Sequence, residues 1–558
     1  MSEKQIMKDR VLAEFSYEAP SIERGYAGQT LYVNLSDNGI AAKPVTKEMK
    51  EKFIGGRGFD LWLLWHGVED DTKWDDPENE IVISTGPCGG ITQYPGSGKS
   101  IAAAISPLTH VIIDSNVGGH YGPYLKFAGW DAIEVQGKAE KDVFVFVDGP
   151  AGQVKILEAP EEAPTDTHLL GQWLIEHFAE DEEDKHWLSF VTAGTAAEHS
   201  YMGCLNFSLY DRKREDLRYK QAGRGGIGTV FRDKRVKALI VRSFPVRGNS
   251  NHPADLGRLI ETGREMQKEV AKFDPTQNRM RNRGTSYLVQ IMDDYDLLPV
   301  MNYKFGAHPE TPRINGDVWE ARYTQGLPDG CWYGCTVACA HAVDEYEVHT
   351  GPYKGQKVIV DGPEYETIAG VGSNCGIFEP WVILEINFYC DTYGIDTISF
   401  GTGMAFVMEC YEAGQISQED TGGLELNFGN AEAALEVLHQ MARGEGFGLI
   451  FGQGIRQMKA HFVEHFGADP DFVQDIGMEA KGLEYSEYLT KESLAQQGGY
   501  GLTNKGPQHD EAWLIFMDMV NNQLPTFEDK AEALHYFPMF RTWFGLCGFC
   551  KLPWNDVV

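Results

Sequence analysis

The two halves of the chain differ in how their apolar residues are spaced. Between Thr30 and about Val241, short runs of β-branched and aromatic residues alternate with glycine-rich turns, most clearly at 81–83, 143–147 and 238–241. Such runs predict strands, because these side chains pack well on a pleated surface and glycine accommodates tight turns. We therefore expect a β-rich domain in which helices occur only as insertions.

Beyond residue 254 the apolar residues take up the three-to-four-residue spacing of an α-helix. The spacing predicts four helical segments, at 255–273, 379–389, 403–413 and 431–443. We predict an α+β fold in which a β-rich N-terminal domain (26–247) is followed by two mainly α-helical domains (248–475 and 476–558). Residues 1–25 are polar without a clear period, so we expect an N-terminal extension there.

Composition narrows the class of protein. With 558 residues, of which 42% are hydrophobic, the chain can bury large cores, and no run of 18 apolar residues predicts a membrane-spanning helix. The formal charge of −33 would repel nucleic acid and anionic membranes, so we expect neither as a partner. Ten cysteines are too few for a disulfide scaffold, and the N-terminus lacks an apolar signal segment. We expect a reducing, cytoplasmic location.

Three of these cysteines, Cys331, Cys335 and Cys339, lie within nine residues beside small glycines. Such clustering is typical of iron–sulfur sites, where thiolates on a tight loop bind several irons. Zinc is the competing interpretation, although zinc motifs usually pair two C-x2-C units. The spacing here is C-x3-C-x3-C, and two more thiols, Cys547 and Cys550, lie near the C-terminus. The triplet favours a cluster with its fourth ligand elsewhere in the chain.

Eight motifs occur in a fixed order along the chain. They are 55–58 (GGRG), 106–109 (SPLT), 115–119 (SNVGG), 125–129 (LKFAG), 222–228 (AGRGGIG), the cysteine triplet, 362–367 (GPEYET) and 390–399 (CDTYGIDTIS). In this order they resemble the tungsten-containing aldehyde ferredoxin oxidoreductases, from about Gly25 to the end of the chain. Each motif alone would be an ordinary turn, but their joint order is specific.

The resemblance implies a tungsten (or molybdenum) centre held by two pterin cofactors, a magnesium ion between the pterin phosphates, and a [4Fe–4S] cluster. Glycine-rich loops suit this task, because their backbone N–H groups can approach phosphate. The β-rich domain would then be the cofactor-binding domain. The residues implied in cofactor binding are Lys99, Asn116, Gly118, Lys220, Gln221, Arg224, Asp391, Asp396 and Leu546.

Within that set, the carbonyls of Asn116 and Gln221 would bind magnesium, and Lys99 and Lys220 would be cationic clamps. Lysine stands at both clamp positions where the family has arginine, so the charge is kept without the planar fork. The triplet also departs from the family's C-x2-C-x3-C spacing by one residue. We expect the loop to bulge while its three thiolates still reach three irons.

Two segments could flank one ligand, since Asp391-x-x-Gly394-Ile395-Asp396 has a partial echo from Thr542 to Cys547. Asp391 and Asp396 would accept pterin N–H donors, and Gly394 followed by Asp396 also predicts a helix end and a helix start. At Thr542 the expected carboxylate is missing. The resemblance makes Cys547 the fourth cluster ligand, with Cys550 as the alternative.

By the same resemblance, Glu366 and His509 are the catalytic residues, and Glu364 and Tyr365 line the same wall. His509 would polarise an aldehyde carbonyl while Glu366 activates a water to attack it. The product would be a carboxylate, and the electrons would pass through the cluster to ferredoxin or an electron-transfer subunit. The alternatives are a cofactor-free structural or electron-transfer subunit, and a reductase of an activated acid or thioester.

Two further expectations concern assembly. In some family members a Glu-x-x-His pair holds iron between subunits, but here Phe388 occupies the histidine position, so we expect no such metal and a surface or capping role for Glu385. Family members also continue past the fourth cysteine, whereas this chain stops at Val558. We therefore expect a shortened C-terminal domain. Either a separate subunit supplies the segment in a hetero-oligomer, or the reading frame ends early, or the domain is naturally short.

Overall fold

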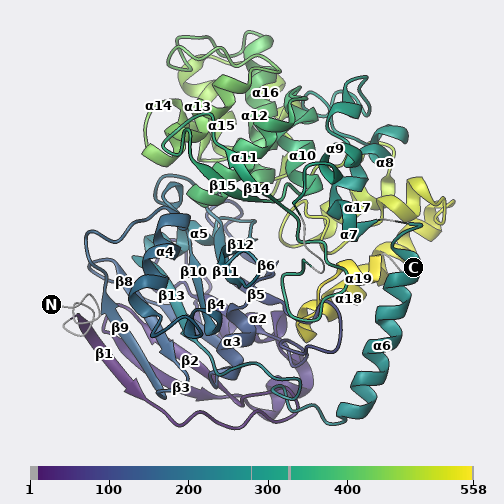
Figure 1. The fold of residues 1–558 in the computed structure, drawn as a ribbon. Helices are drawn as coiled ribbons and strands as arrows, with labels where there is room; N and C mark the ends of the chain where they lie inside the picture. Colours follow the sequence, from purple (N-terminus) through teal and green to yellow (C-terminus); the bar gives the residue numbers. More distant parts are fainter. Residues whose placement is uncertain (1–9, 278, 325–328, 556–558) are drawn as a thin grey trace.

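The first half of the chain folds around two β-sheets, in a computed structural model that describes residues 10–277, 279–324 and 329–555 (Figure 1). One sheet has seven strands in the order β1 (Val11–Ser16), β9 (Gln153–Glu158), β8 (Val143–Asp148), β13 (Val236–Arg242), β10 (Leu188–Thr192), β11 (Leu205–Asp211) and β12 (Asp216–Ala222). The other has six, in the order β3 (Gly39–Pro44), β2 (Gln29–Asn34), β7 (Ala132–Gln136), β4 (Ile81–Thr85), β5 (Ser100–Ile105) and β6 (Ile112–Val117). The three predicted strands are confirmed as β4, β8 and β13.

The central strands are buried on both faces, which explains their continuous apolar runs. On one face Val145, Leu239 and Ile83 belong to a single core shared by both sheets. On the opposite face of the seven-stranded sheet, Phe144 and Ile240 pack with helix α4 (Thr167–Phe178). Two apolar layers around the larger sheet hold this half together.

The second half is mainly helical and has one large apolar core. The four predicted helices are confirmed as α6 (Leu256–Phe273), α11 (Pro380–Tyr393), α12 (Thr397–Glu412) and α13 (Ala431–Arg443). The remaining α-helices are α2 (Arg57–Gly67), α3 (Tyr121–Phe127), α5 (Ile227–Asp233), α7 (Met280–Arg283), α8 (Leu288–Asp294), α9 (Gly316–Glu320), α10 (Tyr365–Val371), α14 (Gly446–Phe451), α15 (Ile455–His461), α16 (Pro470–Ile476), α17 (Leu494–Leu502), α18 (Phe527–Cys547) and α19 (Leu552–Asn555). The second half also contains two small hairpins, β14 (Ala342–Glu347) with β15 (Lys357–Asp361), and β16 (Glu479–Ala480) with β17 (Leu483–Glu484). The predicted α+β class is confirmed.

The edges of the two sheets meet where the helical half begins. Strand β6 is the outer strand of one sheet and β12 is the outer strand of the other, and the two lie close together. An edge strand leaves part of its backbone without a ladder partner. In Figure 1 helices α10 to α16 lie above the sheets, α6 runs down beside them, and the yellow C-terminal helices lie beside the junction. Backbone groups of both sheets therefore face one interdomain region.

Two expectations need correction. Residues 11–16, placed in an N-terminal extension, form edge strand β1, which pairs with β9; residues 1–9 of that extension lie outside the described residues. Glu385 was expected at the surface or at a helix cap, but its side chain is fully buried and accepts hydrogen bonds from Tyr346 and from the His349 backbone. Its position in the middle of α11, which is buried on all sides, explains the difference.

Among the described residues, no helix combines the length and apolar character needed to cross a bilayer. The longest described helix, α18, contains charged residues near its start. This agrees with the absence of a long apolar run in the sequence.

Candidate active site

A cavity of about 400 Å³ lies between the two halves of the molecule. It is lined from the sheet side by six predicted cofactor-binding residues, the last of them in the turn after β12: Lys99, Asn116, Gly118, Lys220, Gln221 and Arg224. The helical side contributes the predicted residues Glu366, Asp391, Asp396 and His509. Residues that the sequence separates by up to about 400 positions thus line one cavity. We call it the main cavity.

Glu366 and His509, the predicted catalytic pair, are in direct contact. His509 Nδ1 lies 2.8 Å from Glu366 Oε1, and the other carboxylate oxygen accepts a hydrogen bond of 2.8 Å from the backbone N–H of Glu487. The Ser486 hydroxyl is 3.1 Å from the same His509 nitrogen. The carboxylate and the imidazole are therefore held facing each other at the cavity wall, the arrangement that acid–base chemistry requires.

Gly394 and Asp396 adopt the cap geometry that the sequence predicts. Gly394 ends α11 in the left-handed conformation (φ 73°), and Asp396 caps α12 by accepting from the Ile398 N–H. Arg224 donates to Asp396 at 3.2 Å. Burial raises the pKa of Asp391 well above its usual range. Both carboxyl groups line the main cavity, and both oxygens of Asp396 already accept hydrogen bonds from the protein.

The echo of this loop has a different conformation. Thr542 to Cys547 lies inside helix α18, which ends at Cys547 with Gly548 in the left-handed conformation (φ 84°). The Thr542 hydroxyl accepts a hydrogen bond of 3.2 Å from Arg57. Leu546 does not line the main cavity; its carbonyl instead faces the glycine turn at Gly55. The prediction of two matching loops is therefore wrong: the first segment contains a loop, and the second is the end of a helix.

A second cavity, of about 130 Å³, adjoins the main cavity and is lined by four thiols, those of Cys331, Cys335, Cys339 and Cys550. We call it the cysteine cavity. Burial raises the pKa of Cys335 to about 12 and also raises the pKa of Cys339. The cavity therefore presents four convergent sulfur atoms.

Lys99 lines both cavities, so its positive charge acts on both of them. Burial opposes its charge, but the surrounding thiols, Cys550 and Cys331 foremost, raise the pKa of its ammonium group above the ordinary value. Gly118 brings strand edge and cysteine loop together, because a Cβ atom there would lie 3.0 Å from the Cys331 sulfur. Both positions are thus adjacent to the thiols as well as to the main cavity.

Cys547, the predicted fourth ligand, lies elsewhere. Its thiol contacts the thiol of Cys88, and the Cys88 N–H donates to the Cys547 carbonyl at 2.9 Å. The contact between the two thiols is a hydrogen bond, and it lowers the pKa of Cys88. Cys550, the alternative, is the thiol that the structure brings to the triplet.

The structure adds residues that sequence reasoning missed. Asp361 lines the main cavity, and one of its oxygens accepts from both Arg218 (2.8 Å) and Lys220 (2.7 Å). Among the described residues its other oxygen, Oδ2, is buried without a hydrogen-bond partner. Asp510 and Lys551 line the opposite wall and pair at 3.1 Å. Two features of the sequence could have identified them: Asp361 directly precedes the GPEYET motif, and Asp510 directly follows His509.

These features fit the implied cofactors. Among the described residues no group of three or more His, Cys, Asp or Glu side chains is close enough to hold a single metal ion. A cubane instead binds each thiolate to a different iron, so its ligands surround a cavity. The free oxygen of Asp361 and the carboxyl groups of Asp391 and Asp396 suit a ring rich in N–H donors. The clamp lysines suit phosphate.

Comparison with known proteins gives consistent matches along the chain. A family model described as the N-terminal domain of aldehyde ferredoxin oxidoreductase matches residues 30–243, and one described as domains 2 and 3 of the same enzyme matches residues 261–558. The tungsten-containing aldehyde ferredoxin oxidoreductase of Pyrococcus horikoshii is 31% identical over 499 residues, covering 88% of this chain and 75% of that protein.

Two further similarities widen the range of relatives. The WOR-like subunit of the aliphatic sulfonate oxidoreductase of Pyrococcus furiosus is 30% identical over 490 residues, covering 85% of this chain and 74% of that protein. A chain of the solved active-site complex BamBC of benzoyl coenzyme A reductase, with bound 1,5-dienoyl-CoA, matches with a TM-score of 0.71 at 19% identity, covering 94% of this chain and 81% of that one. The last similarity concerns the fold alone.

Proposed function

The chain belongs to the aldehyde ferredoxin oxidoreductase family and is an oxidoreductase, and from this premise we propose that it oxidises aldehydes to carboxylates at a tungsten (or molybdenum) bis-pterin centre. The observation that carries the proposal is the contact between Glu366 and His509 at the wall of a cavity that also contains the predicted phosphate and pterin contacts. The overall reaction converts an aldehyde and a water into a carboxylate, three protons and two electrons.

In this proposal each wall of the main cavity has a separate task. Lys99 and Lys220 would hold the pterin phosphates, the carbonyls of Asn116 and Gln221 would hold magnesium, and Asp391 and Asp396 would accept ring N–H groups. The bound metal centre would supply the two-electron redox chemistry. Because the lysines are point charges, they can neutralise phosphate without imposing a planar geometry.

Glu366 is the proposed general base. The Glu487 N–H fixes one carboxylate oxygen, and the other lies against His509. It would take a proton from the water that attacks the aldehyde carbon. An imidazolium at His509, paired with this carboxylate, has a second N–H at Nε2 that can donate to the aldehyde oxygen. The pair would thus polarise the aldehyde and accept the proton of the attacking water from one position.

Cys331, Cys335, Cys339 and Cys550 would hold the [4Fe–4S] cluster that receives the electrons. The argument for Cys550 over Cys547 is its place in the cysteine cavity beside Lys99. Cys547 would remain a thiol paired with Cys88. Both the cavity and the four sulfurs lie next to the main cavity, so electron transfer would need no long route.

A row of exposed apolar side chains supports an electron-accepting partner of the ferredoxin type. Tyr536, Met539, Phe540 and Trp543 lie at helical spacing along α18 and are between 38% and 64% exposed. The helix ends at Cys547, three residues before Cys550, so the row leads toward the cysteine cavity. Large exposed apolar surfaces of this kind mark interaction sites. A small iron–sulfur protein seated there would lie near the proposed cluster.

The function is tested by assaying anaerobically purified protein on a panel of aldehydes with a viologen dye as electron acceptor. Oxidation of at least one aldehyde to its acid, with two dye molecules reduced per aldehyde, is the expected result. Metal-replete protein that is inactive on every aldehyde would refute the activity. Reduction of an activated acid or thioester by the same protein would favour that alternative.

The partner surface has a separate test, in which a low-potential ferredoxin replaces the dye. Trp543→Glu should lower kcat/KM for ferredoxin by at least about tenfold while dye reduction is unchanged, because interface tryptophans often dominate binding. Trp381→Glu is the matched control, since Trp381 is also exposed but lies on α11. Equal effects of the two substitutions would exclude this face of α18.

A further inference from the structure

Arg218 occupies a position that the proposed chemistry does not use, yet it contacts both the base of the cysteine loop and a residue of the main cavity wall. It lies on β12, two residues before Lys220, so both side chains point from the same face of the sheet. Its side chain is 1% exposed. A buried guanidinium is costly unless its N–H groups are paired, so its partners report what it holds in place.

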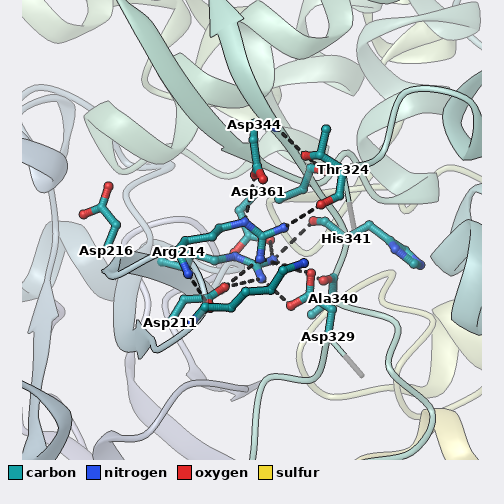
Figure 2. Close-up of polar contacts among 12 residues, drawn as sticks. Asp211, Arg214, Asp216, Thr324, Asp329, Ala340, His341, Asp344 and Asp361 are labelled. Carbon is teal, nitrogen blue, oxygen red and sulfur yellow. Dashed lines mark hydrogen bonds and ion pairs between the residues drawn. The ribbon is translucent and has the colours of Figure 1, made fainter. Parts of the chain in front are cut away.

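Those partners include both ends of the cysteine loop. Arg218 donates to Asp329 at 2.6 Å, two residues before Cys331, and to the backbone carbonyls of Ala340 (3.2 Å) and His341 (3.4 Å), directly after Cys339. The Ala340 N–H also donates to the Asp329 carbonyl at 3.1 Å, which closes the loop. Figure 2 shows Asp329, Ala340 and His341 gathered at this point. One side chain thus closes the base of the loop that carries three thiols.

The same guanidinium contacts Asp361, which lines the main cavity. Its Nη2 donates at 2.8 Å to the Asp361 oxygen that also accepts from Lys220. Asp361 immediately precedes the segment that contains Glu364 and Glu366. The cation pair lowers the pKa of Asp361 despite its burial, so the carboxylate stays charged. Asp361 therefore couples the cysteine loop to the wall that carries the proposed phosphate clamp.

Arg214 supports this arrangement from outside. It donates to Asp344 at 2.8 Å, to Asp211 at 2.6 Å and to Asp329 at 3.3 Å (Figure 2). Asp211 and Asp329 are shared with Arg218, so the two arginines and their carboxylates form one network. Five donors in a rigid fork can satisfy such a set, whereas a lysine ammonium cannot reach all of it from one position.

We infer that Arg218 is a positioning residue that fixes the cysteine loop, and hence the proposed cluster, relative to the main cavity. The inference rests on the proposed function. In it Arg218 does not bind iron or pterin; it sets where three of the four thiolates stand. A loop released from this contact would keep its cysteines but lose their common orientation, which changes the hydrogen bonding and solvent access that tune a cluster.

The test compares Arg218→Lys and Arg218→Met with wild-type protein. Three quantities are measured: iron per chain, the EPR spectrum and midpoint potential of the reduced cluster, and the rate of iron release to a chelator. Arg218→Lys should keep most of its iron but show an altered EPR spectrum and potential. Arg218→Met should release iron at least about tenfold faster, because each of the buried carboxylates Asp329 and Asp361 loses one of its two cations.

Arg242 provides the matched control. It lies on β13 of the same sheet, is also buried, and pairs with Asp148, Glu180 and Asp184, so its partners include neither the cysteine loop nor Asp361. Arg242→Lys and Arg242→Met should lower thermal stability while leaving the EPR spectrum, potential and iron release unchanged. This separates loss of any buried arginine from loss of this one.

The outcomes are distinct. Iron-replete wild-type protein together with unchanged spectra, potentials and release rates in both Arg218 variants overturns this inference alone. Iron-free wild-type protein overturns the proposed function and this inference together. If Arg218→Met fails to fold, Arg218→Lys and Asp329→Asn still decide, since each should alter the spectrum and potential without removing the whole network.

Discussion

Cys547 and Cys550 lie three residues apart, yet their surroundings have little in common. Cys547 ends helix α18 and contacts Cys88. Gly548 then turns the chain, and the Cys550 N–H donates to the Gly96 carbonyl at 2.6 Å, which brings its thiol to the triplet and Lys99. The comparison teaches that a single left-handed residue decides which of two neighbouring thiols faces the cysteine cavity.

The largest effect should come from removing one thiol or the other. Cys550→Ser should lose nearly all cluster iron, because a cubane held by three thiolates is readily lost, whereas Cys547→Ser should keep about four irons per chain. Iron and acid-labile sulfide per chain are the measurements. If Cys547→Ser loses the cluster and Cys550→Ser keeps it, the two thiols exchange roles and the original prediction from the sequence holds.

A second substitution separates the main cavity from the cysteine cavity. Glu366→Gln should reduce aldehyde oxidation by roughly 10²–10⁴-fold, since a positioned general base contributes about that much. Its iron content should match wild type, unlike that of Cys550→Ser. Glu432→Gln, on the exposed face of α13, is the control and should leave the rate unchanged. A Glu366→Gln enzyme with full activity would remove this residue from the mechanism.

Lys99 sharpens the comparison further, because its ammonium lies among the thiols of the cysteine cavity and not beside Cys547. Lys99→Met removes a positive charge and should make the cluster potential more negative by roughly 60 mV, the one-electron equivalent of a tenfold change. Lys141→Met, at an exposed site, should leave the potential unchanged. The check is a redox titration followed by EPR, and an unshifted potential in Lys99→Met would place the cluster away from this lysine.

The smallest effect concerns thiol reactivity in metal-free protein. Because a hydrogen bond from Cys547 lowers the pKa of Cys88, Cys88 becomes a thiolate at lower pH than an ordinary cysteine. Alkylation of Cys88, followed by mass spectrometry of its peptide, should therefore increase with pH. The midpoint of this increase should lie at lower pH than for an ordinary cysteine. In Cys547→Ser this midpoint should move to higher pH. Cys335, whose pKa is about 12, should stay protonated and unreactive throughout.

A midpoint for Cys88 that is the same in wild type and in Cys547→Ser would show that the two thiols do not interact. Cys88 lines a surface cavity of about 300 Å³ with Ile91 and Phe549, so a small alkylating reagent can reach it. Unreactive Cys88 at every pH would therefore also contradict the described arrangement.

Much of the fold could be predicted from the spacing of apolar residues. Buried strands such as β8 and long helices such as α13 carry strong local patterns, and the Gly394–Asp396 cap depends on adjacent residues only. Edge strand β1 was missed because its residues are mostly exposed and carry little apolar signal. The echo at Thr542 was misread as a loop because its glycine is tolerated inside α18.

The site divides in the same way. Residues inside ordered motifs, such as Glu366 and Asp396, could be found from the sequence and line the main cavity. Arg218 and Asp361 could not, because the contact that joins them spans 143 residues and no local pattern records it. The choice between Cys547 and Cys550 depends on a turn of the backbone after α18, which spacing alone does not express.

The most direct test of the account is elemental and cofactor analysis of anaerobically purified wild-type protein. We predict one tungsten or molybdenum, about two pterins and about four irons per chain. Zinc in place of iron, or iron without tungsten, molybdenum and pterin, would contradict the bis-pterin enzyme that the two adjoining cavities describe.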